Sequence, residues 1–91
     1  MKITVKFFAY LRDLFNGREN KIELRSESTI GDLLNLLCDS SGRREQIFDG
    51  GELKPQMIVL KNGYHIKHLS GLETKLDEGD TIVLIPPVGG G

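Results

Sequence analysis

The sequence has a single cysteine, no excess of charge of either sign and no long apolar run. Because Cys38 has no second cysteine in the chain, an intrachain disulfide is excluded, and this cysteine usage suits a reducing compartment. No apolar stretch approaches the roughly 20 residues that cross a bilayer, and no signal peptide opens the chain. We therefore expect a cytoplasmic protein that does not interact with membranes.

The charges are nearly balanced, with 12 basic and 13 acidic residues and a formal net charge of -1. Neither sign forms a long block, so nucleic acids and anionic membranes are poor candidates for partners, and proteins are better ones. A chain of 91 residues fits one compact domain. Such a domain buries only about 60 to 65% of its unfolded surface and has little room for an internal catalytic cavity.

Alternating apolar residues predict strands at both ends of the chain and in its second half. In "KITVKFF", Ile3, Val5 and Phe7 share one face, as in a half-buried strand. "KIELR" can pair back on it as a hairpin, and "TIVLI" is the last strand. "MIVLKNGYHI" predicts two short strands around Asn62-Gly63, a dipeptide favoured in type I′ turns because both central positions need a positive φ.

One main helix is predicted in "STIGDLLNLLCDSSG", with Thr29 as N-cap, Asp32 in the first turn and Gly42 as a plausible stop. Its apolar stripe is made by Ile30, Leu33, Leu34 and Leu37. Cys38 lies beside this stripe and is expected to be a small buried hydrophobe. We expect "AYLRDLFNGREN" to be a turn-rich connector, "RREQIFDGGELKPQ" to be irregular with at most one helical turn, and "SGLETKLDEGD" to be a loop.

The order of these elements predicts an α+β fold, with a mixed sheet of about five strands and one helix packed across one face. The first and last strands are expected side by side at its centre. This order matches the ubiquitin-like β-grasp roll, although other α+β rolls share it. Residues 1–85 would form the domain, and residues 86–91 would form a flexible tail that packs on nothing.

Three stretches, "VKFFAYLRDL", "VLKNGYHIKHLSGLETKLDEGD" and the terminal "IPPVGGG", resemble the small subunit of molybdopterin synthase (the MoaD type) and related ubiquitin-like sulfur carriers, including the thiamine-pathway carrier (ThiS). The resemblance covers nearly the whole chain. The family's tail reads Pro-Pro-Val, a variable residue and Gly-Gly, so Gly89 takes the variable place and Gly90-Gly91 the diglycine.

The resemblance implies a sulfur carrier that is not an enzyme on its own. An adenylating enzyme of the ubiquitin-activating type (MoeB- or ThiF-like) would use ATP to convert the Gly91 carboxylate to an acyl adenylate. A persulfide donor would then leave a C-terminal thiocarboxylate. A larger, MoaE-like subunit would transfer that sulfur to the pterin precursor of the molybdenum or tungsten cofactor.

The tail's chemistry points the same way. The chain has no G-x-x-x-x-G-K-[ST] phosphate loop, hence no evident ATP site, and we expect no bound cofactor. Its carboxylate must therefore react in a partner's active site. Pro86 and Pro87 favour an extended approach, and glycines thread narrow channels. The segment expected to enter the partner comprises Pro86, Pro87, Val88, Gly89, Gly90 and the reacting Gly91, and reaches roughly 20 Å.

Docking also needs a surface. Three predicted strands carry apolar residues at successive positions: the first strand, the strand before Asn62 and the last strand. Because successive side chains point to opposite faces, one set faces the helix and the other faces away. We expect Phe8, Leu60 and Ile85 to form an exposed apolar patch beside the root of the tail. Loops that cover this face, or a strand phase shifted by one residue, are the alternatives.

Other polar residues carry weaker signals. His65 and His68 would point to opposite faces and lack further ligands, so no metal site is predicted. Two groups are expected on the solvated surface: the acids Glu73, Asp77, Glu78 and Asp80, and the lysines Lys61, Lys67 and Lys75.

Three functions fit the sequence: a sulfur carrier for molybdopterin or another thiolation pathway, a protein modifier joined through Gly91 to lysines, and an interaction module with an idle tail. The alternative interpretation of the tail is a frayed terminus or a cloning remnant.

Overall fold

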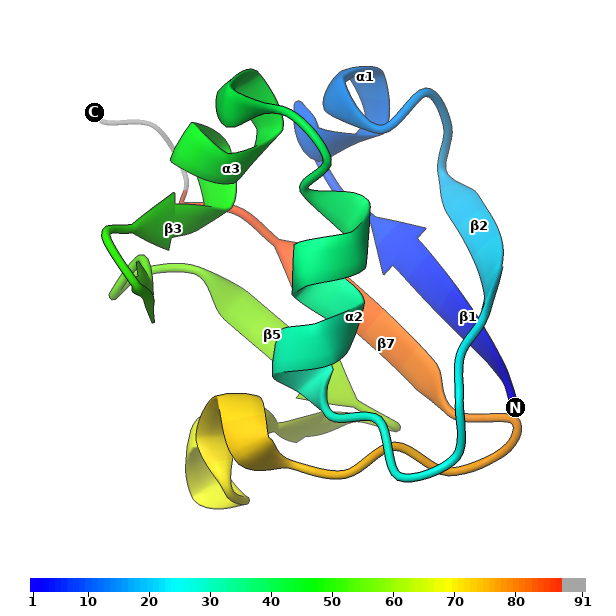
Figure 1. The fold of residues 1–91 in the computed structure, drawn as a ribbon. Coiled ribbons are helices and arrows are strands. Elements are labelled where there is room, and N and C mark those ends of the chain that lie inside the picture. Colours follow the sequence, from blue (N-terminus) through cyan, green and yellow to red (C-terminus); the bar gives the residue numbers. More distant parts are fainter. Residues whose placement is uncertain (88–91) are drawn as a thin grey trace.

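The structure is a computed structural model and describes residues 1–87. Its main sheet has five strands in the order β2-β1-β7-β5-β6. Their bounds are β1 Lys2–Phe7, β2 Glu19–Glu23, β5 Ile58–Lys61, β6 Tyr64–His65 and β7 Thr81–Ile85. β1 and β7 are parallel and central, and the other pairs are antiparallel. The predicted mixed sheet with the first and last strands at its centre is confirmed (Figure 1).

The parallel pairing of β1 and β7 determines where the two ends of the molecule lie. Phe7 pairs with Leu84, so the carboxyl ends of both strands lie at the same end of the sheet. The residues that follow β1 therefore lie beside the end of β7. Figure 1 shows β7 leading toward β3 and α3, at the opposite end of the sheet from the N-terminus.

Helix α2 (Ile30–Leu37) packs across one face of the sheet, as predicted (Figure 1). Thr29 and Asp32 form a reciprocal capping box: Asp32 N donates to Thr29 Oγ1 at 3.2 Å, and Thr29 N donates to Asp32 Oδ2 at 2.9 Å. These bonds satisfy donors that the first helical turn leaves unpaired. The apolar stripe Ile30, Leu33, Leu34 and Leu37 is buried.

The predicted stop at Gly42 is wrong. Helix α2 ends at Leu37, and Gly42 lies inside a further helix, α3 (Ser41–Ile47). The Ser40 side chain accepts a hydrogen bond from Arg43 N at 3.2 Å and so begins that helix. Two short helices therefore occupy the stretch expected to hold one helix and an irregular segment.

Further short elements lie in the segments predicted as connectors or loops. They are α1 Leu11–Leu14, the hairpin β3 Phe48–Asp49 with β4 Glu52–Leu53, and the 3₁₀ turns η1 Ile66–His68 and η2 Gly71–Glu73. Tertiary packing supports α1: Leu11 is buried, and the ring of the following Phe15 stacks on Phe7 with centroids 4.6 Å apart. Elements this short gain little from intrinsic propensity, and their stability comes from packing.

The turn between β5 and β6 is confirmed in detail. Asn62 and Gly63 have φ angles of 49° and 89°, the positive values that a type I′ hairpin needs. The core lies between the sheet and the helices and is formed by Ile3, Val5, Phe7, Leu11, Phe15, Ile30, Leu33, Leu34, Leu37, Cys38, Ile47, Phe48, Met57, Val59, Ile66, Leu76, Ile82 and Leu84. Among residues 1–87, no helix is long and apolar enough to cross a membrane.

Candidate functional site

The predicted strand phase is confirmed at the end of β1. Phe7 is buried, with 1% of its surface exposed, whereas Phe8 is 41% exposed. Phe8 stays attached to the sheet because its backbone N–H donates to the Leu84 carbonyl at 3.2 Å. The ring therefore lies on the outer face of the sheet, away from α2, beside the point where β7 ends.

Two neighbouring strands extend this apolar surface. Cross-strand pairing joins Ile58 to Ile85 and Leu60 to Val83, and directly paired residues share a face. All four side chains are half-buried, whereas Val59 and Leu84, in the other phase, are buried. We call Phe8, Ile58, Leu60, Val83 and Ile85 the outer patch. Phe8, Leu60 and Ile85 had been predicted there, and the same alternation of residues could have indicated Ile58 and Val83.

The chain leaves the sheet through two prolines that differ in exposure. Pro86 is buried and Pro87 is half-buried. Pro87 lines a hollow of about 350 Å³ together with Asp49, Lys54, Pro55 and Gln56. Pro86 therefore packs as part of the domain, so the expectation that the tail contacts nothing from this residue onward is wrong. Val88, Gly89, Gly90 and Gly91 lie outside the described residues, and their roles stay predictions.

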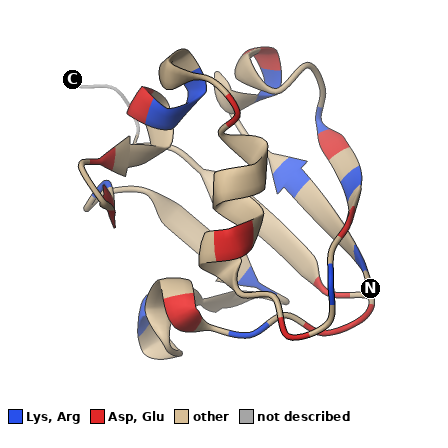
Figure 2. Ribbon diagram, in the orientation of Figure 1, with Lys and Arg blue, Asp and Glu red and all other residues tan. Residues whose placement is uncertain are grey.

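Charge is scarce on the two strands that supply most of the outer patch. Figure 2 shows charged residues on β1, β2, the helices and the loops, while β7 carries none and β5 carries only Lys61 at its end. The two strands that supply most of the patch thus offer an apolar surface, and charges border it. This distribution favours a protein surface as the binding partner.

Glu73, Asp77, Glu78, Lys67 and Lys75 are exposed as expected, whereas Asp80 and Lys61 differ from the expectation of a solvated surface. The side chains of Lys61 and Asp80 are only 17% and 7% exposed. Lys61 Nζ donates to the Lys75 carbonyl at 2.7 Å and lies 3.2 and 3.4 Å from carboxylate oxygens of Asp77 and Asp80. Asp80 also accepts from Asn62 Nδ2 and Asp77 N, both at 2.8 Å. These contacts bind the β5–β6 turn to the start of β7 and pair the buried Asp80 carboxylate with Lys61.

The expected separation of the two histidines is also wrong. The rings of His65 and His68 lie edge to face with centroids 6.1 Å apart, because the strand ends at His65 and η1 follows. His65 Nδ1 accepts from Lys67 N at 3.2 Å. Burial, then the charges of Lys67 and His68, lower the pKa of His65. Within residues 1–87 no group of three or more potential metal ligands occurs.

Residues 5–91 match the model of the ThiS family, a range that includes the terminal glycines. The chain belongs to the ThiS family. It is 36% identical to small archaeal modifier protein 3 of Haloferax volcanii, with each chain covered completely. It is 33% identical to the molybdopterin synthase sulfur carrier subunit of Drosophila yakuba, covering 100% of this chain and 92% of the relative.

Solved structures of ThiS-family relatives confirm the β-grasp fold. The solution structure of small archaeal modifier protein 1 from Methanosarcina acetivorans has a TM-score of 0.82 and 34% identity, and covers 99% of this chain and 96% of that one. The chain is thus a ubiquitin-like protein of a family that holds both sulfur carriers and modifiers. These proteins are generally not catalysts in their own right.

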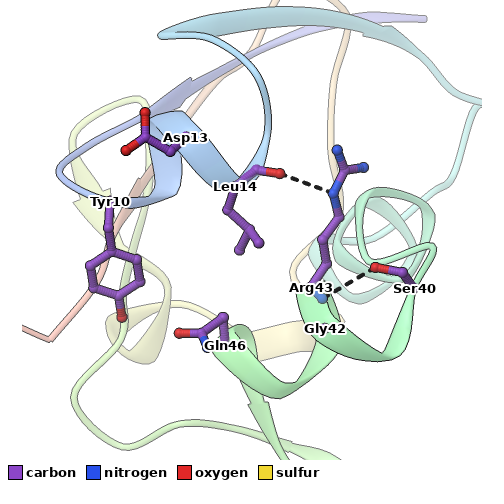
Figure 3. A pocket seen from close by; sticks show the side chains of 7 residues that line it. All are labelled: Tyr10, Asp13, Leu14, Ser40, Gly42, Arg43 and Gln46. Atoms are coloured by element: carbon purple, nitrogen blue, oxygen red, sulfur yellow. Dashed lines mark hydrogen bonds between the residues drawn. The ribbon is translucent and has the colours of Figure 1, made fainter.

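Two further features of this ThiS-family chain are Cys38 and a hollow between two of its helices. Cys38 is buried as predicted, and burial raises the pKa of its thiol, so it is a poor nucleophile. An open hollow of about 660 Å³ lies between α1 and α3 (Figure 3). Its arginine, Arg43, is tied to the protein through Nε, which donates to the Leu14 carbonyl at 3.1 Å. No nucleophile with an adjacent base lines this hollow.

Proposed function

We propose that the chain carries sulfur as a thiocarboxylate on Gly91 and supplies it for molybdopterin synthesis as the small subunit of molybdopterin synthase. The observation that carries this proposal is the family match through Gly91, joined to a chain exit that lies beside an apolar patch. The catalytic side chains belong to partners: an adenylating enzyme of the ubiquitin-activating type and the larger synthase subunit.

The chemistry begins at a carboxylate, which is a poor electrophile. Attack of the Gly91 carboxylate on the α-phosphate of ATP releases pyrophosphate and gives an acyl adenylate with AMP as leaving group. The terminal sulfur of a persulfide then attacks the acyl carbon and expels AMP. A thiol cleaves the resulting acyl disulfide, which leaves the thiocarboxylate on the chain and a disulfide on the donor.

The folded part of the molecule supports this use of the tail. Because Pro86 is buried, the segment able to reach into a partner begins near Pro87. Five residues from Pro87 to Gly91 span at most roughly 18 Å when extended. The outer patch lies next to the end of β7, where the tail begins. A partner that binds the patch therefore receives the tail at a defined distance.

Mass spectrometry of the protein isolated from its native cell tests the proposal. Exchange of one oxygen for sulfur at the carboxylate adds about 16 Da. We expect this species, and we expect the larger synthase subunit to copurify with the chain. A population that carries only unmodified carboxylate while the cell makes molybdenum cofactor would reject the proposal.

A substitution pair tests whether the diglycine must thread a narrow channel. Gly90→Val should abolish adenylate formation and leave the fold unchanged, because a Cβ blocks close passage. Gly42→Val makes the same chemical change at an exposed helical position where an added Cβ meets nothing within 4 Å, and it should leave adenylate formation intact. Normal activation of the Gly90 variant would refute the threading argument.

A second candidate is a protein modifier, favoured by the 36% identity to small archaeal modifier protein 3. The same adenylate would then react with a lysine amine to form an isopeptide. Conjugation adds the mass of a whole protein instead of one sulfur, so the same mass spectra separate the two functions. A sulfur carrier for thiamine or another thiolation pathway would instead copurify with a different acceptor enzyme.

The third reading, an interaction module with a chemically idle tail, is tested by deletion of Gly90 and Gly91. We expect the truncated chain to fold and to lose all sulfur transfer. If every partner interaction and cellular phenotype survived the deletion, the tail would have no chemical role.

A further inference from the structure

Arginines stack on phenylalanine rings at three places in the domain. The pairs are Arg12 on Phe8 at 5.4 Å, Arg43 on Phe15 at 5.0 Å and Arg44 on Phe48 at 4.5 Å from the ring centroid. The attraction of a guanidinium to a ring face holds each side chain in place. The pairs differ in what the rest of the guanidinium contacts.

Two of these arginines use a terminal guanidinium nitrogen to hydrogen-bond another side chain of the domain. Arg43 Nη1 donates to Asp39 Oδ1 at 3.1 Å, and its Nε donates to the Leu14 carbonyl. Arg44 Nη1 donates to Asn35 Oδ1 at 2.9 Å. Their guanidinium groups therefore join neighbouring elements of the fold and are structural.

Arg12 is different. Its Nε donates to the Phe7 carbonyl at 3.1 Å, which anchors the inner edge of the guanidinium. Within residues 1–87, its two terminal nitrogens have no hydrogen-bond partner, and no carboxylate lies within 4.0 Å of it. Arg12 thus presents two terminal nitrogens with their donors free, on a side chain already held by Phe7 and Phe8.

The position of Arg12 connects it to the outer patch. The ring that it covers, Phe8, belongs to that patch and is 41% exposed. Lys6, two residues before Phe8 on β1, lies on the same outer face and is exposed. Glu19 pairs with Lys6 across β2 without forming an ion pair in the described part of the chain. The apolar patch is therefore bordered on this side by the cations Arg12 and Lys6 and, opposite Lys6 on β2, by the carboxylate of Glu19.

We propose that Arg12 is a docking residue, whose guanidinium binds a carboxylate on the adenylating partner next to the apolar contact made by the outer patch. Planar guanidinium and carboxylate groups pair through two parallel hydrogen bonds, which lysine does not reproduce. Because Phe7 and Phe8 already hold Arg12, little side-chain freedom is lost on binding. The matching partner surface is apolar with an Asp or Glu at its border. This inference rests on the proposed function.

The test is ATP–pyrophosphate exchange catalysed by the adenylating enzyme of the same organism, with this chain as the varied substrate. Arg12→Gln should raise KM at least tenfold and leave kcat unchanged, since Arg12 does not touch the reacting carboxyl group. The KM of Arg12→Lys should fall between those of the wild type and Arg12→Gln, because lysine keeps the charge and loses the two parallel hydrogen bonds. Added salt should raise the wild-type KM and reduce its difference from Arg12→Gln.

Arg43→Gln and Arg44→Gln are matched controls, because each removes a guanidinium from a phenylalanine ring elsewhere. Both should keep the wild-type KM when assayed below their unfolding temperatures. A wild-type chain that supports no exchange would overturn the proposed function and this inference together. Normal exchange with an Arg12→Gln KM equal to that of the controls, or a fall in kcat alone, would overturn only the role of Arg12.

Discussion

The two faces of the central sheet have the same kind of residue in different surroundings. Phe7 and Phe8 are adjacent in sequence, yet one is 1% and the other 41% exposed. Helix α2 covers the inner face. On the outer face, the side chains of the outer patch are half-buried or exposed. One alternating sequence therefore supplies a core on one side and an apolar outer patch on the other, because a single helical layer covers only one face.

Charged groups on the two faces differ in whether their hydrogen bonds are made within the domain. Lys61 pairs with buried Ile82 across the strands, so it lies on the inner side, and it is fully engaged by Asp77, Asp80 and the Lys75 carbonyl. Arg12, at the margin of the outer face, keeps its terminal nitrogens free among the described residues. On the inner side a charge must be paired to be tolerated, and on the outer side it remains available to a partner.

The largest expected effect comes from Phe7→Asp. This change buries an unpaired carboxylate and removes the ring stacked on Phe15, so we expect a loss above about 4 kcal/mol, enough to unfold a domain of this size. Circular dichroism and urea unfolding measure it. A folded, stable variant would show that the inner face is not the core.

Asp80→Ala should have the next largest effect. It leaves Lys61 without its buried partner and removes the acceptor of two hydrogen bonds, which we expect to cost about 2 to 4 kcal/mol in free energy of unfolding. Glu78→Ala is the control, since within residues 1–87 this exposed carboxylate accepts only from the Lys2 backbone N–H, at 3.2 and 3.3 Å. Equal losses in both variants would mean that the burial of Asp80 contributes nothing.

Phe8→Asp tests whether the outer face of the sheet is dispensable for folding and needed for partner binding. We expect a change in unfolding free energy within about 1 kcal/mol, because the ring is largely solvent-exposed, together with a large increase in the KM for adenylation. Urea unfolding and pyrophosphate exchange give the two numbers. An unfolded Phe8 variant beside a folded Phe7 variant would reverse the assignment of the faces.

The smallest effect concerns His65 at the end of β6. Its pKa is lowered in the folded protein, so the folded state disfavours the protonated ring. Stability therefore falls as the pH drops through the ordinary value of 6.5 toward the lower folded value, and it is unaffected at higher pH. The Tm difference between wild type and His65→Gln should change across this range. A wild type that gains stability relative to the variant on acidification would contradict the sign.

Local patterns predicted most of the site. Alternation placed Phe8, Leu60 and Ile85 on one face, and the capping residues Thr29 and Asp32 positioned α2. Both features depend on neighbours within a few residues, so they can be read without a structure. The terminal motif Pro-Pro-Val-Gly-Gly-Gly indicated the tail by its order after an apolar strand and by resemblance to a family, and its threading into a partner stays a prediction.

The sequence by itself determined the strand phase, the Asn62-Gly63 turn and the family, because each depends on residues close together in the chain or on the order of the elements. The burial of Lys61 and Asp80, the packing of Pro86 and the terminal nitrogens of Arg12, which have no partner within residues 1–87, emerge only in the folded molecule. Each of these is set by groups that are distant in sequence or by short elements, whose positions follow from packing and not from local propensity.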